Sequence, residues 1–162
     1  LGASERIGNS TSMTLSGGTF GTGGFTETVS TLTLTANSII DLGSGASILS
    51  FANSSGASWT GGATVEIWNW NGSITGGPDQ LFFGTGADGL APGQVAQIVF
   101  RNPNGGSGVF PAQILPSGEV VPVPEPATVC VLVLIGLGLA WRERSSLRRL
   151  RDRFRQERFG LW

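Results

Sequence analysis

The feature that most constrains this chain is an uncharged apolar run, residues 127–141, between a proline-rich segment and an arginine-rich tail. As a helix, the run would satisfy its own backbone hydrogen bonds, as hydrocarbon requires. Its fifteen residues would span roughly 22 Å, less than the ~30 Å hydrocarbon core. Trp141 at the interface and snorkelling Arg142 and Arg144 reduce this mismatch. We therefore expect a single transmembrane helix over residues 127–141 rather than the alternative, a buried core helix.

Charge is distributed unevenly on the two sides of this run. Residues 142–162 carry eight arginines and three acidic residues, whereas residues 1–141 carry two arginines and eight acidic residues. The positive-inside rule places such a tail in the cytoplasm and the preceding body on the other side of the membrane. The arginines that we expect to fix this topology are Arg142, Arg144, Arg148, Arg149 and Arg151.

The segment before the run, residues 118–126, contains prolines at alternate positions from 122 to 126. Proline fixes φ and lacks an amide hydrogen, so we expect an extended linker that no sheet absorbs. Such a strip is accessible, and its plain interpretation is a stiff spacer that holds the body away from the membrane. The residues concerned are Val123, Pro124, Glu125, Pro126, Ala127 and Thr128.

This order of Pro-Glu-Pro triplet, apolar helix and arginines resembles the PEP-CTERM sorting domain of Gram-negative bacteria. The resemblance covers about the last forty residues. It implies recognition by exosortase, a membrane-embedded cysteine protease, through Pro124, Glu125 and Pro126. It also implies a precursor in the inner membrane, with its body in the periplasm and residues 142–162 in the cytoplasm, followed by transfer to the cell surface or outside the cell. Residues 1–10 show no signal peptide, so we expect an export signal upstream.

The body is rich in Gly, Ser, Thr and Asn and is predicted to be mainly β. Apolar pairs at positions i and i+2 indicate half-buried strands, and clusters of turn residues separate them. The pairs are Leu32/Leu34, Leu49/Phe51, Val65/Ile67, Leu81/Phe83 and Ile98/Phe100, with first members 17, 16, 16 and 17 residues apart. This regularity predicts β-solenoid-like stacking over residues 29–117, with an antiparallel β-sandwich or meander as the alternative. Residues 1–28 are expected to be a Gly/Ser/Thr-rich lead-in.

The β-rich region also resembles the repeat-bearing surface proteins of the autotransporter-passenger type over about residues 30–122, through segments such as Leu49-Ser-Phe and Trp68-Asn-Trp-Asn-Gly. This resemblance implies a structural or adhesive role at the cell surface, in an exopolysaccharide or biofilm setting. The alternative is a permanently anchored module that binds surface glycans. In that case Trp68 and Trp70 are the candidates for stacking on sugar rings.

Several chemistries are not expected from this composition. The chain has no histidine, and its one cysteine, Cys130, lies in the apolar run, so a nucleophile with its base and a zinc site both lack their usual residues. The glycine-rich segment Gly84–Leu90 holds one copy of a calcium-loop pattern that needs tandem copies. We expect no enzyme activity, no metal and no cofactor. The body is acidic, which disfavours nucleic acid as a partner.

Overall fold

The computed structural model describes residues 1–74 and 76–123, and Leu1–Val123 form one compact unit. The predicted transmembrane helix, residues 127–141, lies outside the described residues, as do the arginines of residues 142–162. Within the described part of the chain, no helix is both long enough and apolar enough to cross a membrane.

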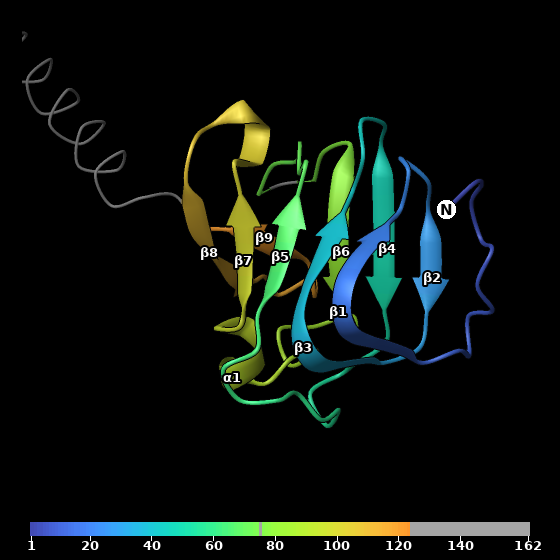
Figure 1. The fold of residues 1–162 in the computed structure, drawn as a ribbon, viewed down its shortest axis with the longest axis vertical. Helices are drawn as coiled ribbons and strands as arrows, with labels where there is room; N and C mark the ends of the chain where they lie inside the picture. The colour runs from blue at the N-terminus through green and yellow to red at the C-terminus, as the bar shows by residue number, and fades with distance from the viewer. Residues whose placement is uncertain (75, 124–162) are drawn as a thin grey trace, which may run out of the picture. The chain divides into compact units, whose positions relative to one another are not determined.

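The described residues are mainly β, as predicted (Figure 1). The elements are β1 (Met13–Gly21), β2 (Glu27–Val29), β3 (Leu32–Asp41), β4 (Ser47–Phe51), β5 (Val65–Trp68), β6 (Asp79–Phe83), α1 (Pro92–Val95), β7 (Ile98–Arg101), η1 (Pro103–Gly105), β8 (Val109–Ile114) and β9 (Val120–Pro122). One sheet has the order β1-β3-β5-β7-β8-β9, and the other has the order β2-β4-β6.

From β1 to β7 the chain alternates between the two sheets, and every strand pairs in parallel with its neighbour. Figure 1 shows β3, β5 and β7 pointing one way and β2 and β4 the other. An antiparallel β-sandwich or meander does not allow this pairing, so that alternative is wrong for these strands. β8 and β9 differ because each pairs antiparallel with the strand before it, which makes the larger sheet mixed.

The core lies between the sheets and is built from residues in register. Leu49 pairs with Leu81 and Phe51 with Phe83, all of them buried. The rings of Phe51 and Phe83 are stacked, with centroids 4.9 Å apart. On the other sheet, Ile67 lies between Ile40 and Phe100. Each of the five apolar pairs in the sequence is buried, so their assignment to inward-facing strand positions is confirmed.

The 16- to 17-residue interval, however, does not separate residues that stack. It joins consecutive strands of opposite sheets, and stacked partners are further apart, as with Val65 and Ile98. Leu32 and Leu34 also do not stack on the apolar pair of β5 as expected. β3 is 10 residues long, and only Ser38–Asp41 pair with β5. Leu34 instead bridges to Trp59, whose indole Nε1 donates to the Leu32 carbonyl at 2.9 Å.

The first 28 residues are part of the folded body, which corrects their assignment as a lead-in. They contain β1 and most of β2. The segment before β1 is held by Glu27 of β2. Glu27 is completely buried, in register with Leu49, and its carboxylate accepts hydrogen bonds from the backbone N–H groups of Arg6 and Ile7 at 2.9 and 3.2 Å. Glu27 thus occupies an inward-facing strand position. Its carboxylate holds the N-terminal segment against the end of the core.

Replacing Leu81 by alanine is expected to destabilise the body by about 2–5 kcal/mol, because it removes a fully buried side chain from the ladder. The control is Phe82→Ala on the same strand, at a partly exposed position, which should cost less. Denaturant unfolding of the two variants measures the difference. Equal losses would contradict the assignment of Leu81 to the core.

Candidate functional site

The proline-rich segment is attached to the body through β9. Val120 and Val121 are completely buried, and Pro122 is buried as well. The next residue, Val123, donates its backbone N–H to the carbonyl of Pro111 on β8 at 2.8 Å. Of the expected recognition residues, Val123 is therefore in contact with the body, and residues 124–128 lie outside the described range.

The structure corrects the prediction that an extended linker begins at residue 118, because residues 120–122 form a strand. Pro122 is tolerated there for two reasons. β9 is the last strand of its sheet, where proline is usual. In addition, the bonds from Leu115 N–H to Glu119 and from Val123 N–H to Pro111 put Pro122 and Ala112 at a non-hydrogen-bonded position, so the missing N–H costs no bond to β8.

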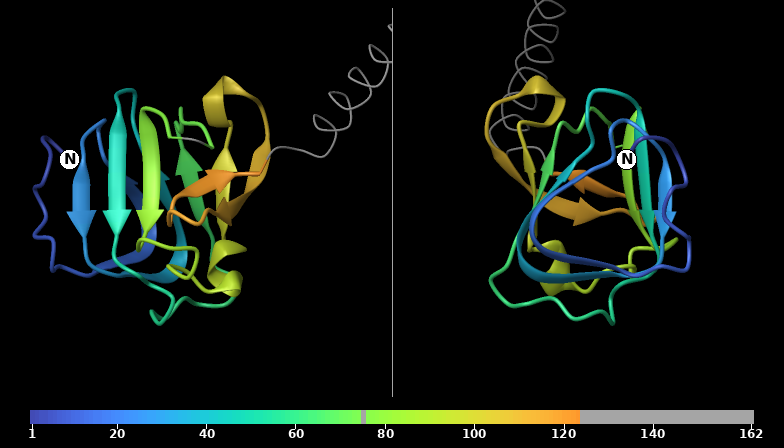
Figure 2. Two further views of the ribbon diagram at one scale, coloured as in Figure 1. Left: turned by 180° about the vertical axis from the view of Figure 1, so that it is seen from behind. Right: turned by 45° about the vertical axis from the view of Figure 1, so that its right-hand side comes forward.

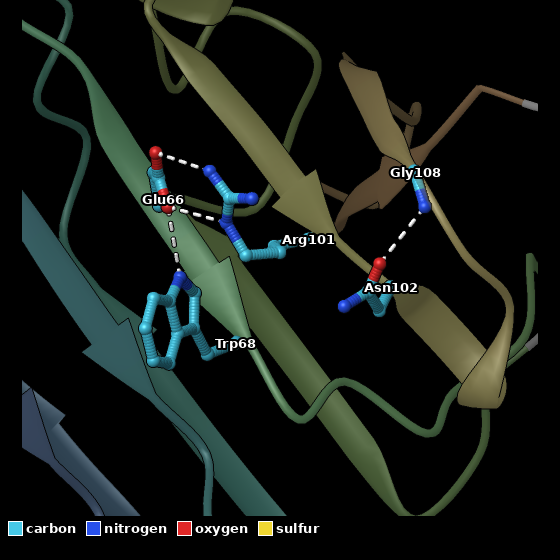
Figure 3. Close-up of polar contacts among 5 residues, drawn as sticks. All are labelled: Glu66, Trp68, Arg101, Asn102 and Gly108. Atoms are coloured by element: carbon cyan, nitrogen blue, oxygen red, sulfur yellow. Dashed lines mark hydrogen bonds and ion pairs between the residues drawn. The ribbon is translucent and has the colours of Figure 1, made fainter.

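A second candidate region lies on the outer face of β5 and β7, where Glu66, Trp68 and Arg101 form a cluster (Figure 3). The Nε and Nη2 atoms of Arg101 donate to the two carboxylate oxygens of Glu66 at 2.8 and 3.0 Å. The indole Nε1 of Trp68 donates to Glu66 Oε2 at 2.9 Å. Arg101 and Trp68 are cross-strand partners, so sheet register brings the three side chains together.

The pKa of Glu66 is lowered to about 2, mainly by the hydrogen bonds from Arg101 and, to a smaller extent, by the one from Trp68. The side chains of Arg101 and Glu66 are 41% and 28% exposed, so solvent screens the pair and its effect on stability is small. The indole ring of Trp68 is thereby held in one orientation on an exposed face, with 37% of the residue accessible.

Trp70 does not join this surface, contrary to the sequence interpretation that grouped it with Trp68. Asn69 adopts a left-handed conformation, with φ of 59°, and this ends the alternation of the strand. Trp70 consequently turns inward, is only 2% exposed, and packs edge-on against Phe100 with ring centroids 5.5 Å apart. Of these two tryptophans, Trp68 is the one whose ring is accessible to a ligand.

A cavity of about 540 Å³ lies among the loops that follow β3, β5 and β7. Asp79 contributes a buried carboxylate, which accepts hydrogen bonds from the backbone N–H groups of Ser47 and Asn71 at 3.0 and 2.7 Å. Burial raises the pKa of Asp79 in spite of these bonds. The indole Nε1 of Trp70 is buried without a partner among the described residues. The lining also includes the four asparagines Asn69, Asn71, Asn102 and Asn104.

The remaining candidate, the glycine-rich segment Gly84–Leu90, is a tight turn after β6. Gly89 donates its N–H to Gly86, and the side chain of Asn53 donates to the carbonyl of Asp88. Within residues 1–74 and 76–123, no three His, Cys, Asp or Glu side chains are grouped so that they could hold a metal ion.

Sequence analysis did not identify the three buried acids, Glu27, Asp79 and Glu119. For two of them, the alternation of apolar and polar residues along the strand indicated burial. Asp79 falls on the same face of its strand as Leu81 and Phe83, and Glu27 on the same face as Val29. An acid in phase with core residues indicates a buried carboxylate that needs hydrogen-bond donors.

Residues 122–145 match the PEP-CTERM protein-sorting motif. No curated protein and no solved structure matches the chain, so nothing supports the autotransporter-like interpretation of the body. PEP-CTERM signals are recognised by exosortase, a membrane protein, and proteins that carry them are exported to the cell surface via the membrane. The motif thus implies exosortase-dependent surface sorting.

The pKa of Glu66 leads to a prediction about Glu66→Gln. Because this pKa lies below the usual value of 4.5, the ion pair stabilises the fold above pH 4.5 and loses this effect as the pH falls towards 2. The variant should therefore unfold at a slightly lower temperature than the wild type at pH 7, and the gap should close near pH 2. A gap that is constant across this range would contradict the assignment.

Proposed function

We propose that this chain is an exported, non-enzymatic protein of the cell surface or extracellular matrix, with a structural or adhesive body. Exosortase processes its precursor at the C-terminal signal. The precursor lies in the inner membrane, with its body in the periplasm, residues 127–141 in the bilayer and residues 142–162 in the cytoplasm. Glu125 and its flanking prolines carry recognition, and the arginines set the orientation.

The observation that carries this proposal is the position of the matched motif. It begins at Pro122, in the last strand of the body, and runs through the proline triplet, the apolar run and the first two arginines of the tail. In this proposal the folded domain, the recognition segment and the membrane segment follow one another directly in the sequence. This is the arrangement of a cargo that is held at a membrane by a removable signal.

The body supports a structural role through its parallel stacking. We interpret β1 to β7 as a short β-solenoid, since each circuit of the chain adds one strand to each sheet. In such folds each unit contacts only its neighbours, and the result is an extended surface. The sequence has no histidine to act as a catalytic base, which also favours a role in structure or adhesion.

Replacing Glu125 by alanine should abolish processing while export continues, because the charged residue of the recognition triplet is lost. The measurement is the intact mass of the protein from membrane and extracellular fractions of the native host. Wild type should end near residues 124–128, and the variant should retain Trp162. Asp88→Ala, which removes an exposed acid from the body, is the control and should be processed normally. An intact wild-type C-terminus, found only in membranes, would overturn the proposal.

The cluster around Trp68 supports a second candidate, a permanently anchored module that binds surface glycans. A partly exposed indole ring, held in place by a charged partner, is suited to stacking on a sugar ring. In this interpretation the proline triplet is a spacer, and processing plays no part.

Under the glycan-binding candidate, Trp68→Ala should reduce binding to polysaccharide purified from the host by about tenfold, through loss of the stacking surface. The control is Val109→Ala, because Val109 is also exposed and lies on β8 opposite Arg101. Sedimentation of the protein with the polysaccharide measures binding. Equal binding of wild type and Trp68→Ala would eliminate this site.

A further inference from the structure

The matched sorting motif and the folded body overlap at Pro122 and Val123. Pro122 is the last residue of β9, and Val123 is hydrogen-bonded to Pro111. Only Pro124 separates Val123 from Glu125. Val123, which is held by the body, is thus only two positions before the acid that we expect the protease to recognise.

The C-terminal hairpin, which we define as β8 and β9, residues 109–122, is bonded to both sheets. β8 pairs with β7 of the larger sheet. At the turn, Phe83 of the smaller sheet donates its N–H to the carbonyl of Gly118 at 2.9 Å, and Glu119 bridges to Phe82. Figure 2 shows β9 crossing the end of the body between β6 and β8. The start of β9, next to this turn, is therefore held against the smaller sheet.

A protease binds its substrate as an extended backbone on both sides of the recognised residue, and buried, bonded backbone is not accessible to it. On the N-terminal side of Glu125, Val120, Val121 and Pro122 are buried, and Val123 is hydrogen-bonded to Pro111. Resting on the proposed function, we propose that β9 restrains the sorting segment and that exosortase acts on the fraction of molecules in which β9 has separated from β8. The strand thereby sets the rate of processing.

Two features of the hairpin make such separation local. The end of β9 is weakly tied, because Ala112 and Pro122 form a non-hydrogen-bonded pair and Pro111 has no N–H to return the bond from Val123. At the other end, Glu119 Oε1 is buried without a hydrogen-bond partner among the described residues. When β9 separates, water can donate a hydrogen bond to that oxygen. This hydrogen bond lowers the free-energy cost of separating the strand. Local opening of this kind does not require the ladder of β1 to β7 to unfold.

The first test compares two valine-to-alanine variants of the full precursor, incubated with host membranes that contain the protease. Val121 and Val65 are both buried, in β9 and β5 respectively. When opening is fast relative to cleavage, the cleavage rate follows the open fraction. Val121→Ala should therefore raise the rate by about tenfold, the effect of removing two buried methyl groups. Val65→Ala should leave it near the wild-type rate. Equal acceleration would show that global unfolding controls processing, and no acceleration by either variant would overturn the proposal.

The second test locks the hairpin with a disulfide between Ala112→Cys and Pro122→Cys, in a Cys130→Ala background. Non-hydrogen-bonded partners have Cα atoms about 4.5 Å apart, which suits a disulfide. The oxidised precursor should be cleaved at least tenfold more slowly than the same molecule after reduction. Pro122→Cys in the same background controls for the lost proline. If that change alone stops cleavage, Ile114→Cys with Val120→Cys provides a second non-hydrogen-bonded lock outside the matched motif.

Glu125→Ala separates failure of this proposal from failure of the proposed function. If Glu125→Ala blocks cleavage but oxidation of the hairpin has no effect, the chain is an exosortase substrate and β9 does not restrain it. If wild type is not cleaved, or Glu125→Ala is cleaved normally, the proposed function itself is wrong. The expected pattern is that Glu125→Ala blocks cleavage, the oxidised hairpin slows it and Val121→Ala accelerates it.

Discussion

Inward-facing side chains of parallel strands stack on one another across successive circuits of the chain, and the rest of the body depends on this stacking. Leu49 on Leu81 and Phe51 on Phe83 show the pattern on one sheet, and Ile40, Ile67 and Phe100 show it on the other. Burial of these residues provides the driving force, while parallel register fixes which of them meet. The loops can vary in length because only the strand positions must align.

Polar residues inside the ladder are found where the stacking stops or the chain must be held. Glu27 occupies an inward position and binds the backbone of the N-terminal segment. Asp79 binds the backbone at Ser47 and Asn71, and so joins the first residue of β4 to the loop after β5. Glu119 is different, since one of its oxygens has no partner within the described part of the chain. Each acid thus lies where two segments of the chain are held together. Glu119, the acid nearest the sorting motif, has the least complete set of hydrogen bonds.

The sequence was sufficient to predict a mainly β body and all five buried apolar pairs, because alternation directly reports which face of a strand is apolar. It was not sufficient for the order of stacking, since equal spacing along the chain does not distinguish neighbours in one sheet from strands in opposite sheets. The left-handed conformation of Asn69, which turns Trp70 inward, could not be predicted from the alternation of apolar and polar residues. The sequence also misled at Pro122, because proline disfavours a strand interior but is tolerated at an edge and at a non-hydrogen-bonded position.

The antiparallel hairpin also has a consequence for how copies of this protein can associate. Open edges of parallel sheets invite the addition of further strands, and natural proteins block such edges with proline or a change of direction. Here the last strand runs across the end of the body and carries Pro122, which offers no N–H to an incoming chain. This edge therefore disfavours the addition of a strand from a second copy, which protects the body from head-to-tail association through β9.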